Sequence, residues 1–226
     1  MTPPPRPTLD RARHIKYWLR CLKTCLPTEY TSTDLSRLTL AFFCISALDL
    51  LGELSTVTTP EERSQWINWV YRNQHPSGGF RGSPATDFGA VATTENRSWD
   101  PAHLPATCFA LITLVTLGDD LSRFDRRGAL ELLPKLQRDD GSFGEWRHES
   151  SGEVIGGTDM RHMYFASAIR WALRGRHSTG VEDVPDFDVD KAVAFIRASQ
   201  TYDSGISEKP FGEAHGGLFT DCVAVD

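Results

Sequence analysis

The chain has 226 residues, 40% of them hydrophobic, which suits a globular protein with a sizeable core. Its formal net charge of −6 and its pI near 5.6 argue against a surface for nucleic acid, which needs a clustered basic stripe. We therefore expect no nucleic-acid partner. Residues 1–8 are rich in proline and are expected to be disordered, whereas 9–226 are expected to form a single domain.

The cysteines and the apolar segments indicate a cellular compartment. The five cysteines are odd in number and include no CxxC pair, so a reduced protein is favoured over a disulfide framework. No apolar run approaches the roughly 20 residues of a membrane span, and no leader segment follows Met1. These features predict a cytoplasmic protein.

The first half of the chain is expected to be helical. Apolar residues at helical spacing predict a helix over 9–26. The segment 34–52 is apolar on almost every face, which is typical of a buried helix. A Thr-Pro-Glu-Glu sequence that starts at Thr59 supplies an N-cap, a proline and two acids, and it predicts a helix that runs to Gln74.

The second half alternates between two kinds of helix. The segments 103–117 and 159–173 are apolar on most faces, whereas 125–137 and 188–200 are amphipathic. Buried helices covered by amphipathic ones produce this alternation. The sequence therefore predicts an all-α fold with two concentric layers of helices.

A repeated unit underlies this alternation. Gln74, Gln137 and Gln200 each end a helical segment, and each is followed by a short glycine turn and then by Phe or Ile. They lie 63 residues apart. A fixed period of this length indicates one supersecondary unit that is copied along the chain and buries its apolar face on the next copy.

Two acidic segments are weak candidates for chemistry. Asp119 and Asp120 begin like the DDxxD motif that holds magnesium diphosphates, but Arg123 occupies the last acidic position, so we expect the pair to cap a helix. The acids around Asp188 lack the adjacent carboxylates of a DxDD proton donor and are expected to form a capping loop. The polar segment 89–100 is interpreted as a surface loop.

Two basic residues are stronger candidates for binding an anion. Arg161 stands one turn into a mostly apolar helix, where its guanidinium either binds phosphate oxygens or pairs with Asp159 or Glu153. His215 precedes two glycines at the start of a helix-like segment, a place that favours anions.

Several stretches carry a resemblance to a known family. They are SRLTLAFFCISALDLLGEL (36–54), GGFRG (78–82), LGDDLSR (117–123), DGSF (140–143), DMRHMYFASAIR (159–170) and YDSGISE…EAHGG (202–217). Together they resemble the β subunit of protein prenyltransferases, specifically the type I geranylgeranyltransferase. The resemblance implies an α-α toroid of helix hairpins around a funnel that holds the isoprenoid.

The family resemblance also implies an activity and partners. The expected function is that of the β subunit, paired with a helical α subunit. The enzyme would transfer geranylgeranyl from geranylgeranyl diphosphate to the cysteine of a C-terminal CaaX sequence, as a thioether. Clients would include Rho-type small GTPases. The alternatives are a farnesyltransferase β subunit, against which the small Thr39 argues, and a non-catalytic helical scaffold.

The resemblance assigns roles to residues of this chain. Arg161 and His215 would hold the diphosphate. Thr39, Phe43 and Tyr164 would line the isoprenoid channel. The pocket for the last CaaX side chain would consist of Thr39, His103, Pro105 and His162, with His162 in place of an aromatic residue of the family pattern.

The expected zinc ligands of the family are an Asp and a Cys one residue apart, followed by a distant His. All three come after the His-Gly-Gly helix in the family, and the resemblance places them beyond Asp226. Asp221 and Cys222 are adjacent and no His follows them, so they are interpreted as accidental. The expectation is a C-terminally truncated, partial toroid with no catalytic and no metal-binding residue of its own. Zinc is then the cofactor of the complete family member only.

Overall fold

The computed structural model describes residues 9–175 and 180–218. The expectations for residues 1–8, for Asp221 and Cys222, and for zinc ligands beyond Asp226 all fall outside this part of the chain, so they stay predictions.

The helices are α1 (Arg11–Lys23), α2 (Arg37–Leu50), α3 (Leu54–Val57), α4 (Pro60–Tyr71), α5 (Leu104–Thr116), α6 (Arg126–Leu136), α7 (Met160–Arg174) and α8 (Val189–Ala198). Four 3₁₀ segments are η1 (Thr28–Ser36), η2 (Pro84–Thr86), η3 (Gly89–Val91) and η4 (Asn96–Trp99). The prediction of an all-α fold is confirmed, with one small addition: the antiparallel pair β1 (Trp146–Arg147) and β2 (Val154–Ile155).

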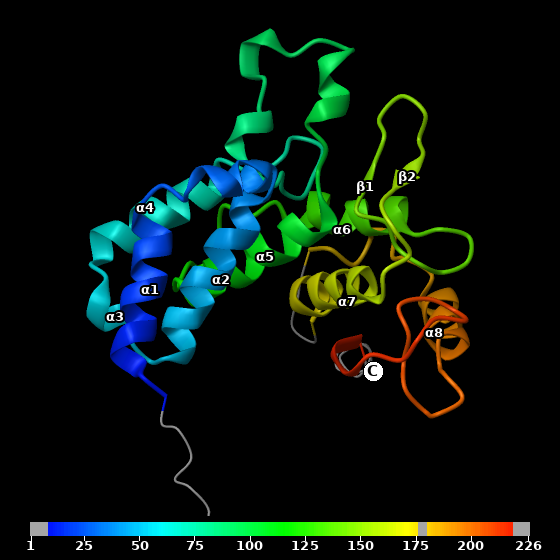
Figure 1. Ribbon diagram of the computed structural model, residues 1–226. Coiled ribbons are helices and arrows are strands. Elements are labelled where there is room, and N and C mark those ends of the chain that lie inside the picture. The colour runs from blue at the N-terminus through cyan, green and yellow to red at the C-terminus, as the bar shows by residue number, and fades with distance from the viewer. Residues whose placement is uncertain (1–8, 176–179, 219–226) are drawn as a thin grey trace, which may run out of the picture.

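The helices form an inner layer with an outer cover (Figure 1). α5 packs against α2 on one side and against α7 on the other, so these three helices form a continuous inner row. α1 and α4 cover this row at α2 and α5, and α6 covers it at α5 and α7. α5 is hydrophobic along its whole length, which is why it can be enclosed on both sides.

The predicted start of α4 is confirmed by a complete capping box. The Glu62 amide donates to the Thr59 hydroxyl over 3.2 Å, and the Thr59 amide donates to the Glu62 carboxylate over 3.0 Å. Pro60 fills the first helical position, whose amide would have no partner. The helix ends at Tyr71, before the predicted Gln74, because Gln74 already pairs with Phe80 as an isolated β-bridge.

The predicted repeat is visible as three identical pairings. Isolated antiparallel bridges join Gln74 to Phe80, Gln137 to Phe143 and Gln200 to Ile206. Each bridge turns the chain back after an outer helix and buries the aromatic or aliphatic residue in the core. The period found in the sequence therefore corresponds to a structural unit.

The glutamine side chains explain why this residue recurs. The Gln74 side-chain oxygen accepts from the Asp125 amide over 3.0 Å, and the Gln137 oxygen accepts from the Asp188 amide over 2.8 Å. Asp125 and Asp188 are the N-caps of α6 and α8. Each of these glutamines therefore links its own turn to the cap of the next outer helix.

Glycine is required where this link brings two backbones together. Gly78 and Gly141 have φ values of +96° and +88°. A Cβ atom at Gly78 would lie 2.3 Å from the Gly128 carbonyl oxygen, and one at Gly141 would lie 2.1 Å from the Lys191 carbonyl oxygen. Both the backbone conformation and the lack of space therefore exclude a larger residue.

The prediction that Asp119 and Asp120 cap a helix is wrong. Asp119 accepts from the Tyr71 hydroxyl and from the Leu121 amide, and Asp120 accepts from the Ser122 amide. These acids stabilise a turn, and the next helix starts only after Asp125. The prediction for Asp188 is confirmed, since its carboxylate accepts from the Lys191 amide. No helix in the described part of the chain is long and apolar enough to span a membrane.

Candidate functional site

A row of aromatic rings crosses the three inner helices. Phe42 of α2 stacks on Phe109 of α5 with ring centroids 4.5 Å apart, and Phe109 meets Phe165 of α7 edge-on at 5.1 Å. Phe43 extends the row at the α2 end, and Tyr164 extends it at the α7 end, 5.7 Å from Phe165. The row is an apolar wall, and Phe43 remains 51% exposed.

Sequence reasoning found the two ends of this aromatic row but missed its middle. Phe43 and Tyr164 were expected in the channel, whereas Phe42, Phe109 and Phe165 were not. All three lie in segments that are apolar on most faces, so periodicity alone does not show which face is turned inward. Thr39 is half-buried and lies one turn before Phe43 on α2.

Arg161 lies in the first turn of α7, one turn before Tyr164 and Phe165. Its backbone amide and its guanidinium both bind the carboxylate of Asp159, the N-cap of the helix. Burial alone would raise the pKa of Asp159, but the hydrogen bonds from Arg161 outweigh burial and lower that pKa. The Arg161 side chain is 65% exposed, so the ion pair with Asp159 leaves the guanidinium accessible to an anion from solution.

His215 lies in a separate segment that returns to the core. Its amide donates to the Ile206 carbonyl over 3.0 Å, and Leu218 packs against the main core cluster. The Gly217 amide donates to His215 Nδ1 over 3.1 Å. In the neutral ring the proton is therefore on Nε2, which makes this exposed nitrogen a hydrogen-bond donor.

The structure brings together two of the residues expected in the peptide pocket. His103 is the N-cap residue of α5 and His162 lies on α7, with the carboxylate of Glu145 between them. Glu145 Oε1 lies 3.7 Å from His162 Nε2, and Oε2 lies 4.0 Å from His103 Nδ1. Burial lowers the pKa of His103, which Glu145 only partly offsets. Pro105 follows in the first turn of α5 and is half-buried.

Glu145 was missed by sequence reasoning. It lies two residues after the bridged Phe143, and its backbone is fixed on both sides. Its amide donates to the Ile155 carbonyl over 2.8 Å, and its carbonyl accepts from the Leu104 amide over 2.7 Å. The only available signal was its place after the second glycine turn, which does not predict contact with α5 and α7.

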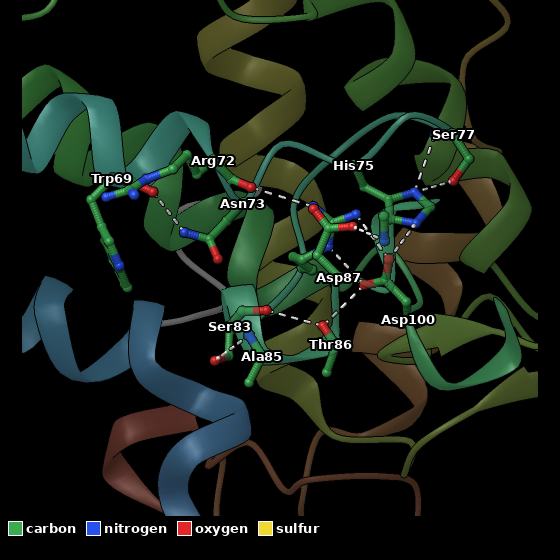
Figure 2. A network of polar contacts seen from close by, with 12 residues as sticks. Trp69, Arg72, Asn73, His75, Ser77, Ser83, Ala85, Thr86, Asp87 and Asp100 are labelled. Atoms are coloured by element: carbon green, nitrogen blue, oxygen red, sulfur yellow. Dashed lines mark hydrogen bonds and ion pairs between the residues drawn. The ribbon is translucent and has the colours of Figure 1, made fainter. Parts of the chain in front are cut away.

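A network of polar contacts surrounds the buried Asp100, in the segment that precedes His103 (Figure 2). The Arg81 guanidinium donates to both oxygens of Asp100, over 2.7 and 2.8 Å. The Thr86 hydroxyl donates to Asp100 over 3.0 Å, and His75 Nε2 lies 3.6 Å from it. Burial alone would raise the pKa of Asp100, but the nearby His75 ring and the hydrogen bonds from Arg81 and Thr86 lower it to about 2.

The interpretation of 89–100 as a surface loop is confirmed for 89–99, which are exposed or half-buried, whereas Asp100 at its end is buried. The Arg81–Asp100 pair also supports the backbone around His103. Arg81 directly follows Phe80, whose carbonyl accepts from the His103 amide over 2.8 Å. The pair therefore joins the chain segment at Phe80 to the segment that leads into His103.

The family model for the prenyltransferase alpha-alpha toroid domain matches residues 9–225. The chain belongs to this family. The geranylgeranyl transferase type-1 β subunit of Arabidopsis thaliana is 31% identical over 97% of this chain and 56% of the relative. That of Dictyostelium discoideum is 33% identical over 92% of this chain and 60% of the relative. The farnesyltransferase β subunit of Schizosaccharomyces pombe is 30% identical over 93% of this chain and 47% of the relative.

A solved structure supports the prenyltransferase toroid fold. The Candida albicans protein geranylgeranyltransferase-I complexed with GGPP superimposes with a TM-score of 0.79 at 24% identity, over 97% of this chain and 59% of that chain. At this identity the likeness shows the fold alone. The chain spans a little over half the length of the geranylgeranyl transferase relatives that it matches.

The zinc that prenyltransferases imply has no fitting ligand set in residues 9–175 and 180–218, where no three His, Cys, Asp or Glu side chains are grouped to hold a metal. Cys44 and Cys108 are buried, which raises the pKa of the first thiol to about 11 and that of the second to about 12. Without a metal, these two thiols are therefore protonated at neutral pH.

Proposed function

We propose that the chain acts as the β subunit of a heterodimeric type I geranylgeranyltransferase in the cytoplasm. Its partners would be a prenyltransferase α subunit, geranylgeranyl diphosphate and proteins that end in CaaX, such as Rho-type small GTPases. The observation that carries the proposal is the aromatic row over α2, α5 and α7, with the exposed Arg161 one helical turn before the row's last two rings on α7. An apolar wall next to a cationic group suits a lipid diphosphate.

The reaction exchanges one bond for another. The cysteine sulfur of the client forms a thioether bond with the first carbon of the lipid, the bond from that carbon to the diphosphate oxygen breaks, and the thiol proton is released to solvent. Arg161 and the Nε2–H of His215 would stabilise the negative charge that develops on the departing diphosphate. The aromatic row would bind the isoprenoid chain and keep water from it.

The remaining residues would set the length of the lipid and the identity of the peptide. Thr39, one turn before Phe43, would leave room at the end of the channel for the longer isoprenoid. Thr39, His103, Pro105 and His162 would surround the last CaaX side chain. We assign no step to zinc, because no set of the described residues fits it.

Farnesyl is the competing lipid, since farnesyltransferase β subunits also match the chain. The test is binding of the two lipid diphosphates to the chain co-purified with its α subunit. Thr39→Trp adds an indole to the channel, and overpacking costs about 1–3 kcal/mol. We therefore expect roughly tenfold weaker binding of geranylgeranyl diphosphate, with farnesyl diphosphate spared or improved.

The matched control is Thr56→Trp, an exposed threonine on α3, which should leave both affinities unchanged. If the Thr39→Trp variant retains its full preference for geranylgeranyl diphosphate, Thr39 does not limit the channel. If the wild-type complex binds neither lipid diphosphate, the proposed function itself is wrong.

A further inference from the structure

Helix α1 has an apolar face and a basic face. Its apolar side chains pack against a core cluster that α2 and α3 share: Ile15, Trp18, Leu19 and Leu22. α1 therefore lies against α2 on the outside of the inner row (Figure 1). None of its residues is fully buried, and it carries five basic residues and no acidic one. The side of α1 that faces away from the core is therefore positively charged.

Three of these five basic residues have no counter-ion. Arg11 and Lys23 each pair with a glutamate, over 3.4 and 2.6 Å. The other three, Arg13, Lys16 and Arg20, are exposed, and no carboxylate in the described part of the chain forms an ion pair with them. Spacings of three and four residues place these three side chains on one face of the helix.

An aromatic ring lies among these cations. Tyr17 comes four residues after Arg13 and three before Arg20, so it shares their face, and it is 55% exposed. We define the α1 patch as Lys16, Tyr17 and Arg20. Leu26, which follows α1 in the chain, is exposed as well. This surface therefore offers positive charge and apolar contact together.

The chemistry of the α1 patch distinguishes between classes of partner. Nucleic acid or an acidic peptide would neutralise the two cations and leave the Tyr17 ring in water. A bilayer satisfies both features, because anionic headgroups bind Lys and Arg while a tyrosine ring lies at the boundary between headgroups and acyl chains. The composition of the patch therefore favours a lipid surface.

The charge distribution of the chain sets its orientation on such a surface. α1 contributes +5 to a net charge of −6, so the remainder of the chain carries −11. An anionic surface attracts α1 and repels the remainder, which turns α1 towards the lipid. We propose that the α1 patch binds the surface of a bilayer that contains anionic phospholipids. The inference does not depend on the proposed function, since it uses no residue of the aromatic row.

The test is flotation of the full-length chain with vesicles of phosphatidylcholine, either alone or mixed with phosphatidylserine. The wild type should float only with the mixed vesicles. Lys16→Gln combined with Arg20→Gln should weaken this binding about thirtyfold, because each cation near an anionic surface contributes roughly fivefold. Tyr17→Ala should weaken it roughly fivefold at unchanged net charge, because the partly buried ring is lost.

The matched control is Lys135→Gln combined with Arg197→Gln, two exposed cations on α6 and α8. It changes the net charge by the same amount and should bind the mixed vesicles as the wild type does. Equal flotation with both kinds of vesicle, or with neither, would overturn the inference, and so would full binding by the Lys16 and Arg20 variant. Full binding by Tyr17→Ala would show that charge alone is recognised, as by a nucleic acid or an acidic peptide, and would overturn the assignment to a bilayer.

Discussion

The molecule contains two Arg–Asp ion pairs with the same chemistry and different surroundings. In the Arg81–Asp100 pair the side chains are 4% and 11% exposed. In the Arg161–Asp159 pair they are 65% and 13% exposed. The comparison shows that the two pairs differ in the exposure of the guanidinium and not in the type of partner, so that the Arg161 guanidinium is accessible from solution and the Arg81 guanidinium is not.

The partners of each arginine explain the difference. Arg81 reaches back across a loop, and its guanidinium contacts Asp100, the Asp87 carboxylate and the Arg72 carbonyl, all from neighbouring segments. Arg161 binds the cap of its own helix, two residues away, and holds no distant segment through that carboxylate. An incoming diphosphate could reach the Arg161 guanidinium from solution because that side chain is 65% exposed, whereas the Arg81 side chain is only 4% exposed.

The strongest test of this contrast is the loss of each arginine. Arg81→Gln leaves Asp100 as a buried charge without its counter-ion, which we expect to lower the free energy of unfolding by about 3–5 kcal/mol. Arg161→Gln removes an exposed pair and should cost less than about 1 kcal/mol. Urea unfolding of both variants measures the two values. Equal losses would contradict the distinction between the two pairs.

Lowering the pH should remove the stabilisation that the buried Arg81–Asp100 pair provides, over a defined pH range. The Asp100 pKa in the folded chain, about 2, lies below the ordinary value of 3.8, so its stabilisation is present above that ordinary value and is lost as the pH falls from about 4 towards 2. The shift corresponds to about 2 kcal/mol. Asp100→Asn should be less stable at neutral pH, and should lose this part of the acid dependence in urea titrations at successive pH values. An identical acid dependence in the variant would show that Asp100 is not responsible.

The smallest expected effect concerns the exposed pair and its ligand. In the complex with the α subunit, Arg161→Gln should weaken binding of geranylgeranyl diphosphate roughly tenfold, because a hydrogen bond to a charged group contributes about 1.5 kcal/mol or more. Arg13→Gln, an exposed arginine on α1, is the matched control and should bind normally. Calorimetric titration measures both affinities. A normal affinity in the Arg161 variant would remove this residue from the diphosphate site.

The sequence was sufficient for features that are local or repeated. The caps at Thr59 and Asp188 and the period of the three glutamines depend on neighbouring residues or on copies of one unit, so they could be read directly. The acidic pair at Asp119 and Asp120 was misread because a turn and a helix cap use the same acidic residues, and only the position of the next helix distinguishes them.

The parts that could not be predicted involve segments that meet only in the folded chain. Arg81 and Asp100 are separated by 19 residues, and Glu145 lies between histidines of two different helices. The aromatic row depends on which face of each buried helix is turned inward. A helix that is apolar on all faces does not reveal that face in its sequence. The family resemblance predicted Phe43 and Tyr164 at the ends of the aromatic row and the two histidines on either side of Glu145. It did not predict the three rings in the middle of the row or Glu145 itself.

The links from Gln74 to Asp125 and from Gln137 to Asp188 also have a consequence for how the chain opens and closes. Both span 51 residues, so each unit is coupled mainly to the unit that follows it. When each unit contacts mainly its neighbours, the cooperativity of unfolding depends on the contacts at each junction between units and not on the chain as a whole. Amide exchange should then proceed in blocks, with the α8 block free to open while the Gln74–Asp125 junction stays protected.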